Sequence, residues 1–213
     1  RAVVTDLGVP VEKVEVVLPG LDLDAFSCTK NRSSIRSQIG VQEHQHLVLY
    51  IGRLRSIKGV EYGIKAFARA AEGNPTLHLA LAGDGEQRDY LENLANDLGI
   101  SKRATFLGER SDLPDVLSAA DSVLMPSLRE GFPRVAIEAM AASKPVIATR
   151  VGAISEAIID DNSGILVESK DVPAMSAAIT HLTGDSVLQA RLGANARTRV
   201  ENHYSAESYV ARL

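Results

Sequence analysis

Short runs of consecutive apolar residues alternate along the chain with longer segments in which apolar residues recur every three or four positions. Residues 46–51 (HLVLYI) form one such run, and the segment after it places Val60, Ile64 and Phe67 at helical spacing. A strand buried on both faces is apolar throughout, and a helix with one buried side shows the three-to-four spacing. The main part of the chain therefore begins with a predicted strand and a predicted helix.

The same alternation predicts five more strands and six more helices. The strands are expected at residues 76–81, 103–107, 122–125, 145–149 and 165–167, and the helices at residues 86–98, 112–120, 133–142, 154–159, 172–182 and 186–204. Gly99 and Pro126 stand where two of these elements end, as expected of residues that stop helices and strands. Strands without polar alternation, separated by helices, predict an α/β fold with a doubly wound parallel sheet of Rossmann-like type.

The predicted sheet divides the chain into three parts. The doubly wound domain covers residues 45–184, and residues 185–213 form C-terminal helices. Residues 1–44 hold a predicted strand at 14–18 followed by a turn-rich stretch, which suits a linker segment and the first strand and helix elements of the domain. The chain opens on Arg1 and runs directly into a helix-like stretch, so we expect a piece of a longer protein.

Composition narrows the class of protein. The 213 residues are 45% hydrophobic and 23% charged, which suits one globular α/β domain with appendages. A formal net charge of -4 argues against a nucleic-acid partner, because affinity for a phosphate backbone needs clustered Lys and Arg. Cys28 is the single cysteine, so neither an intramolecular disulfide nor a cysteine zinc site is expected. With no apolar run of about 20 residues and no signal-peptide pattern, we expect a cytoplasmic protein.

Two cations follow the strand predicted at residues 46–51. Arg53 and Lys58 lie in the loop 52–59, between the end of that strand and the start of the next helix. Ligands of doubly wound sheets bind at this edge, where Arg offers a planar fork for phosphate oxygens, Lys a compact charge and the helix start its free amides. The loop can therefore hold a diphosphate. From these residues alone, solvated loop charges without a ligand are an equally good interpretation.

The loop after the 122–125 strand carries two acids. Glu130 lies before the helix and Glu138 about a turn and a half inside it, so both belong to the same corner of the sheet. Gly131 permits close approach of a ligand to the backbone, and Pro133 suits the first helical position, which leaves the remaining amides available to an anion. The alternative is that both glutamates only complement the helix dipole, for about 0.3 to 1 kcal/mol each.

Several motifs occur in a fixed order over most of the chain. They are Gly52-Arg53-Leu54 with Lys58-Gly59, Gly83-Asp84-Gly85, Pro126-Ser127, Glu130-Gly131-Phe132-Pro133, Glu138-Ala139-Met140-Ala141, and residues 145–149 and 152–156. This order resembles the C-terminal domain of the group 1 (family 4) glycosyltransferases. Residues 7–10 and 16–22 are similar to the segment in which those enzymes cross from one domain to the other.

The resemblance implies a GT-B fold and a retaining transfer of a sugar from a nucleoside diphosphate sugar, with no metal and no other cofactor. Residues 45–184 would then be the nucleotide-sugar-binding domain. The expected catalytic residues are Arg53 and Lys58, which grip the diphosphate and stabilise its growing charge, and Glu130, which contacts the donor sugar. The other expected donor contacts are Gly131, Phe132, Arg134 and Val135 near the sugar and diphosphate, Glu138 at the ribose, and Glu109 and Arg110 beside the base.

The resemblance also implies that part of the enzyme lies elsewhere. In the family, the acceptor site and a catalytically important histidine belong to an N-terminal domain that this chain does not contain. We therefore expect the chain to be inactive alone and prone to self-association through apolar surface. The five histidines are expected at the surface or in packing. Where the family often has two glycines this chain has Gly152-Ala153, which predicts a modest change of local geometry.

Other functions stay open beside this one. A glycosidase is disfavoured, because its carboxylates flank the bond from opposite sides, about 5 to 10 Å apart, whereas Glu130 and Glu138 share one helix start. A phosphorylase, or a glycogen- or sucrose-synthase-like member of the same fold, would hold phosphate or a nucleotide at the Arg53 and Lys58 corner. A non-catalytic nucleotide-binding or interaction module is the third alternative. The 186–204 helix mixes basic and acidic residues, so it predicts either a brace for the other domain or a solvated helix and gives no grounds for membrane binding.

Overall fold

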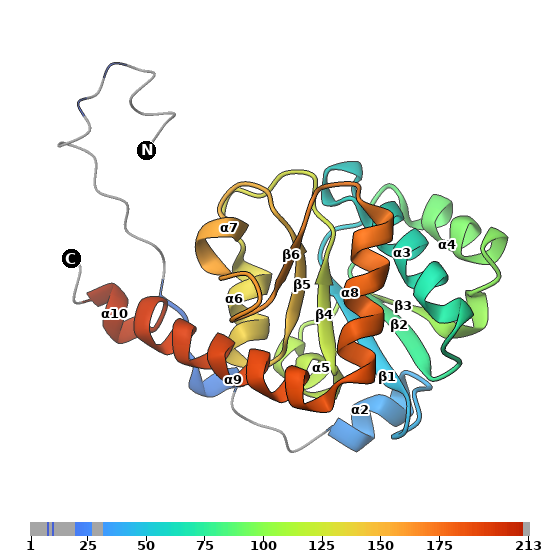
Figure 1. Ribbon diagram of the computed structural model, residues 1–213, viewed down its shortest axis with the longest axis horizontal. Coiled ribbons are helices and arrows are strands. Elements are labelled where there is room, and N and C mark those ends of the chain that lie inside the picture. Colours follow the sequence, from blue (N-terminus) through green and yellow to red (C-terminus); the bar gives the residue numbers. More distant parts are fainter. Residues whose placement is uncertain (1–7, 9, 11–19, 27–31, 211–213) are drawn as a thin grey trace.

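Six parallel strands form the centre of the protein in the computed structural model, which describes residues 8, 10, 20–26 and 32–210 (Figure 1). The strands are β1 (His46–Ile51), β2 (Leu77–Ala82), β3 (Ala104–Gly108), β4 (Ser122–Met125), β5 (Val146–Thr149) and β6 (Ile165–Val167), in the order β3-β2-β1-β4-β5-β6. Each strand matches its predicted bounds or starts one residue later, which confirms the doubly wound sheet. The strand predicted at residues 14–18 falls outside the described residues, and the three-part division of the chain stays a prediction.

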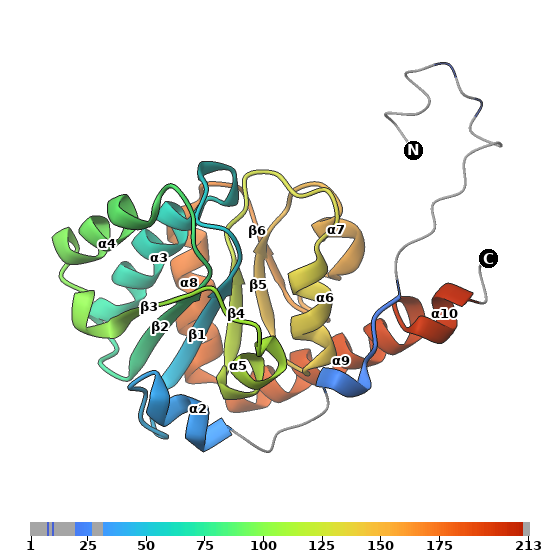
Figure 2. The same cartoon turned by 180° about the vertical axis from the view of Figure 1, so that it is seen from behind.

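Helices cover both faces of the sheet (Figures 1 and 2). One layer holds α3 (Val60–Glu72), α4 (Arg88–Asp97) and α8 (Val172–Gly184); the other holds α2 (Arg32–Gln38), α5 (Leu113–Ala119), α6 (Arg134–Ala141) and α7 (Ile154–Ala157). The remaining helices of the described residues are α9 (Ser186–His203), α10 (Ala206–Val210) and three short 3-10 helices, η2 (Asp24–Phe26), η3 (Ser56–Lys58) and η4 (Ser101–Arg103). Within the described ranges, no helix has both the length and the apolar composition of a membrane span.

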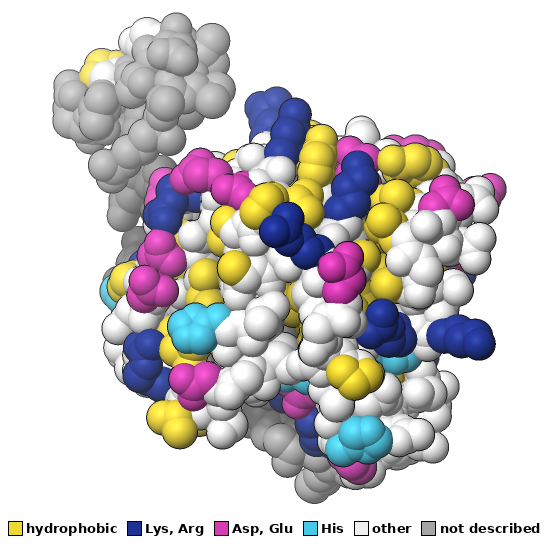
Figure 3. Space-filling view, turned by 45° about the vertical axis from the view of Figure 1, so that its right-hand side comes forward, with side chains coloured by type: hydrophobic (Ala, Val, Ile, Leu, Met, Phe, Trp, Pro, Cys, Tyr) yellow, Lys and Arg dark blue, Asp and Glu magenta, His cyan; other side chains and the backbone are white. Residues whose placement is uncertain are grey.

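Burial on both faces explains why the strands are apolar throughout. In β1, Leu47 and Leu49 pack into the core under α5 and α6, whereas Val48 and Tyr50 pack into the core under α3 and α8. Neither side of the strand meets water, so polar alternation would bury unpaired polar groups. Outside, the α3 and α8 face carries basic, acidic and apolar side chains intermingled (Figure 3).

The long helix α9 is fixed to the domain by its arginines as well as by its apolar side. Arg197 donates to Ala141 O at 2.7 Å, and Arg199 donates to Ala157 O at 2.6 Å. Both carbonyls lie at the ends of helices, where backbone acceptors lack a partner within the helix. These side chains therefore hold α9 against α6 and α7. The interpretation that the charges of α9 are only solvated is wrong for Arg197 and Arg199.

The helix α2 is absent from the predicted elements because its buried side includes an arginine. Arg36 is 0% exposed and donates to Ala119 O at 2.8 Å, Gln42 O at 2.7 Å and Asp121 Oδ2 at 3.2 Å. A fully buried cation is rare unless it is paired and bonded in this way, so hydrophobic periodicity gives no signal for such a helix. The bonds tie α2 to the end of α5 and to the amino end of β1.

The histidines lie at the surface or in packing, as expected. His46 and His78 are buried, and each ring bonds a hydroxyl of a neighbouring strand, at 3.0 and 2.8 Å. The other three, His44, His181 and His203, are exposed.

Asp121 accepts hydrogen bonds from Arg32, Arg36 and the Leu47 amide at the amino end of β1. Burial opposes its charge, but the Leu47 amide at 2.7 Å and the Arg32 guanidinium at 2.7 Å more than offset burial, so the pKa of Asp121 lies below its usual value. A carboxyl with a lowered pKa in the folded state adds stability above its unfolded pKa of about 3.9, and that stability is lost as the pH falls through the folded value.

We expect the stability advantage of the wild type over Asp121→Asn to shrink as the pH falls from about 5 to about 2, because the charge that the asparagine lacks is then protonated away. Urea unfolding at a series of pH values measures this difference. The exposed Asp89, replaced by asparagine, serves as control and should follow the wild type. A difference for Asp121→Asn that stays constant over this range would contradict the argument.

Candidate functional site

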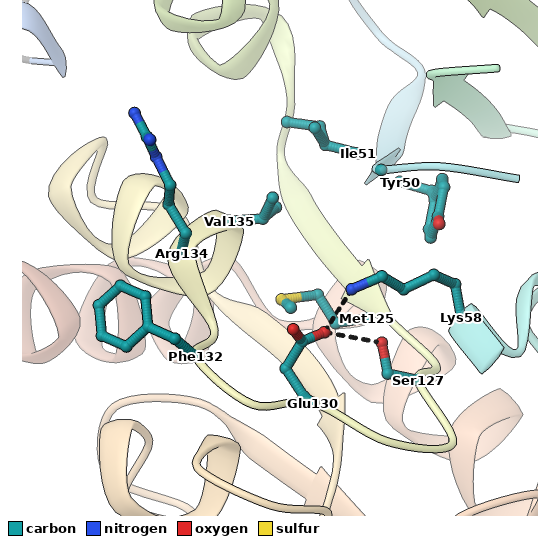
Figure 4. Close-up of a pocket in the computed structure, with 10 residues that line it drawn as sticks. Tyr50, Ile51, Lys58, Met125, Ser127, Glu130, Phe132, Arg134 and Val135 are labelled. Carbon is teal, nitrogen blue, oxygen red and sulfur yellow. Dashed lines mark hydrogen bonds and ion pairs between the residues drawn. The ribbon is translucent and has the colours of Figure 1, made fainter. Parts of the chain in front are cut away.

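A cavity of about 160 Å³ opens where β1 and β4 lie side by side in the sheet (Figure 4). These neighbours are not consecutive in the chain, so the segments that follow them leave in opposite directions, and doubly wound sheets bind ligands at such a point. The cavity is lined by Tyr50, Ile51, Gly52, Lys58, Met125, Ser127, Glu130, Phe132, Arg134 and Val135. It therefore lies at the carboxyl ends of the two central strands, where the sequence predicted the site.

The loop after β1 brings Lys58 to the cavity. Lys58 ends η3, and the next residue, Gly59, takes a left-handed conformation with φ 60° before α3 begins. A Cβ at Gly59 would lie 2.1 Å from Pro126 O. The loops after β1 and β4 therefore approach each other more closely than a residue with a side chain at position 59 would allow. The close approach of the two loops places Lys58 opposite Glu130.

The loop after β4 brings Glu130 to the same space. Its side chain is 11% exposed, and Oε2 lies 2.7 Å from Lys58 Nζ and 3.4 Å from Ser127 Oγ. Ser127 is itself held by Thr149, which donates from Oγ1 to Ser127 O at 2.5 Å. The position of the carboxylate thus depends on contacts with β5 as well as on its own loop.

The segment after β5 fixes the backbone of Glu130. Gly152 has φ 51°, and a Cβ there would lie 1.9 Å from Glu130 O. Ala153 donates its amide to the same oxygen at 3.4 Å and has an ordinary helical backbone, with φ -73° and ψ -3°. Ala153, which stands where the family often has its second glycine, is therefore accommodated without backbone strain. Its backbone conformation is one that any residue adopts.

Glu138 does not line the cavity. It is buried on α6, one turn after Arg134, and its Oε1 accepts from Arg134 Nε at 2.8 Å. The Arg134 side chain is 74% exposed and does line the cavity. The Oε1 atom of Glu138 is therefore available to a ligand only where Arg134 gives up or shares this bond.

Of the remaining predicted residues, the structure brings Phe132 and Val135 into the lining beside Lys58, Glu130 and Arg134. Four others do not line the cavity: Arg53, Gly131 and Glu109, which are exposed, and Arg110, which pairs with Asp112. The roles expected of all these residues stay predictions. In the described part of the chain, no group of three or more His, Cys, Asp or Glu side chains is placed to hold a metal ion.

The lining also includes Gly52 and Ser127, which the motifs contain without a predicted role, and three residues outside the motifs, namely Tyr50, Ile51 and Met125. Tyr50 is the most informative of them. Its hydroxyl donates to Arg53 O at 2.9 Å, and burial, with a smaller effect of Glu130, raises the pKa of this phenol above its usual value. The signal that could have found these residues is their place at the carboxyl ends of β1 and β4.

Fold and cavity together define a doubly wound domain built to hold a ligand at its switch point, of the class that binds nucleotides. Residues 31–199 match the model of the family described as glycosyl transferases group 1. This protein belongs to that family, as the motifs indicated.

Individual relatives agree. The chain is 34% identical over 201 residues to the uncharacterized glycosyltransferase MJ1607 of Methanocaldococcus jannaschii, with 92% of this chain and 51% of that protein covered. It is 34% identical over 213 residues to the D-inositol 3-phosphate glycosyltransferase of Mycobacterium bovis, with 97% of this chain and 42% of that protein covered. The chain thus spans about half the length of the curated relatives it matches.

Two solved structures show which half this is. The chain is similar to Anabaena HepE in complex with UDP, with a TM-score of 0.89 and 27% identity over 98% of this chain and 57% of that one. It is also similar to the C-terminal domain of the group 1 family protein LpcC from Francisella tularensis, with a TM-score of 0.79 and 29% identity over 88% of this chain and 100% of that one. The chain corresponds to the C-terminal domain of a GT-B glycosyltransferase.

The role of Gly152 in fixing Glu130 can be tested by stability. Gly152→Ala should lower the free energy of unfolding by about 2 to 3 kcal/mol, because the new side chain would strain a left-handed backbone and collide with Glu130 O. Urea unfolding measures the loss. Gly73→Ala is the matched control, since Gly73 has φ -95° and nothing within 4 Å of an added Cβ. Equal losses of unfolding free energy in the two variants would contradict the idea that the close approach of Gly152 to Glu130 O fixes this loop.

Proposed function

We propose that this chain binds a nucleoside diphosphate sugar as the donor-side half of a retaining glycosyltransferase. The observation that carries the proposal is the cavity at the switch point, where Lys58 and Glu130 meet 2.7 Å apart at the start of α6. The relatives support it, because Anabaena HepE has been solved in complex with UDP and with UDP-glucose. UDP is therefore the first nucleotide to test.

The diphosphate would be held by cations and by backbone amides. Lys58 lies in the lining, and Arg53 is exposed on the same loop, where its backbone is held by Tyr50. As the bond to the sugar breaks, negative charge grows on the leaving phosphate, and a preplaced ammonium and guanidinium stabilise that charge without a metal ion. The amides at the start of α6 add partial positive charge at the same place.

The two acids would have separate tasks. Glu130, with its carboxylate in the cavity, would contact the donor sugar. Glu138 would reach the ribose hydroxyls after its Oε1 is released by Arg134, whose exposed side chain is able to move. Since the chain spans about half of its relatives, the acceptor and the remaining catalytic groups would come from the other half, and we expect this chain to be inactive alone.

The proposal predicts binding of one nucleoside diphosphate without magnesium. In calorimetric titrations with UDP, GDP and ADP, one of them should bind with or without the metal. Arg53→Ala combined with Lys58→Ala should weaken that binding by at least about tenfold, because each charge-assisted bond contributes about 1.5 to 3 kcal/mol.

Lys65→Ala combined with Arg69→Ala removes the same two charges from α3, away from the cavity, and serves as control. Equal weakening in both double variants would mean that only net charge matters. Binding of inorganic phosphate in preference to every nucleotide would favour a phosphorylase. No binding to the folded wild type would contradict the proposal for this chain.

A further inference from the structure

The opposite charges of the cavity are already bonded to each other. Lys58 Nζ lies 2.7 Å from Glu130 Oε2, with side-chain exposures of 30% and 11% (Figure 4). The other cation of the lining, Arg134, is bonded to Glu138. Among the described residues that line the cavity, Glu130 is the single carboxylate, so it determines how much positive charge Lys58 presents to a ligand.

The ligand that the proposed function requires changes its charge during the reaction. In a nucleoside diphosphate sugar, the terminal phosphate is substituted on two oxygens, by the anhydride bond and by the sugar, and carries one negative charge. Transfer breaks the bond between the sugar carbon and the phosphate oxygen, and the electron pair stays on that oxygen. A new bond joins the sugar carbon to the acceptor oxygen, and the proton of the acceptor hydroxyl leaves to the phosphate or to water. The terminal phosphate of the spent nucleotide is substituted on one oxygen only and has a second pKa of about 6, so it carries nearly one more negative charge at neutral pH.

An unpaired lysine would favour the spent nucleotide over the donor. A lone ammonium in a part-buried site attracts a doubly charged phosphate more strongly than a singly charged one. Such a site would be blocked by its own product. A carboxylate at 2.7 Å from the ammonium cancels this preference, since the second charge is then repelled about as strongly as it is attracted.

Resting on the proposed function, we propose that Glu130 sets the selectivity of the site by charge: it neutralises Lys58 and so prevents the spent nucleoside diphosphate from binding more tightly than the nucleoside diphosphate sugar. This role is separate from contact with the donor sugar, because it concerns the spent nucleoside diphosphate, which no longer carries a sugar. Glu130 is held in place for it by Ser127 and by the Gly152 contact with its carbonyl.

The test compares the wild type with Glu130→Gln, which keeps the shape and the hydrogen bonds of the side chain but removes its charge. Calorimetric titrations use UDP, UDP-glucose and UMP. The variant should bind UDP about fivefold to tenfold more tightly, because Lys58 is no longer neutralised. UMP, which lacks the terminal phosphate, should change less than twofold, and UDP-glucose, whose terminal phosphate carries one charge fewer, should tighten less than UDP.

A pH series gives a readout that a purely structural role would not move. Between pH 5.5 and 7.5 the terminal phosphate of UDP loses its second proton. The lining carries Glu130, the cations Lys58 and Arg134, the phenol Tyr50 and none of the described histidines, so the phosphate is the group expected to titrate. In Glu130→Gln the affinity for UDP relative to UDP-glucose should rise with pH, and in the wild type it should not.

Glu86→Gln is the matched control, because Glu86 pairs with Arg55 at 3.2 Å on the same side of the sheet but does not line the cavity. It should leave the ratio of UDP to UDP-glucose affinity unchanged. An unchanged affinity of Glu130→Gln for UDP, or equal gains for UDP and UMP, would overturn this inference while the proposed function stands. If the wild type binds GDP or ADP in place of UDP, the same comparison is made with that nucleotide, its monophosphate and its glucose conjugate. A wild type that binds none of the three nucleoside diphosphates would overturn both proposals.

Discussion

The reversal of strand order between β1 and β4 is the constraint on which the rest of the structure depends. Right-handed crossovers put α3 and α4 on one face of the sheet and α5, α6 and α7 on the other. The segments after β1 and β4 therefore part at the middle of the sheet, and the cavity lies between them. Lys58 comes from one segment and Glu130 from the other, so their pairing is a product of the topology.

The two ends of the sheet use charge in different ways. At the amino end, Arg36 is fully buried and bonded to backbone carbonyls and to Asp121, which ties α2 to the domain and keeps the guanidinium out of reach of a ligand. At the carboxyl end, Lys58 is part exposed and pairs with the side chain of Glu130. A ligand phosphate can share or replace a side-chain partner, whereas the backbone carbonyls cannot leave. The same type of interaction thus gives rigidity at one end and exchange at the other.

A protein with a formal net charge of -4 can bind an anion only through local positive charge. At the cavity, Lys58, Arg134 and the start of α6 supply this positive charge. Glu130 and Glu138 balance part of that charge. This balance suits a ligand that must enter with one charge and leave with another. In the glycosyl transferases group 1, to which the chain belongs, the proposed donor is such a ligand.

The sequence by itself determined the strands, most helices, the fold class and the family, because buried strands and amphipathic helices leave a periodic record and the loop motifs keep their order. It also placed Lys58, Glu130 and Arg134 at the correct edge of the sheet. Tertiary structure decided what these residues bond: that Lys58 pairs with Glu130, that Arg134 covers Glu138, and that Tyr50 holds Arg53 O. It also revealed α2, whose buried Arg36 no hydrophobic pattern predicts. Periodicity records which side of an element is buried, whereas contacts between distant loops depend on how the whole chain closes around the sheet.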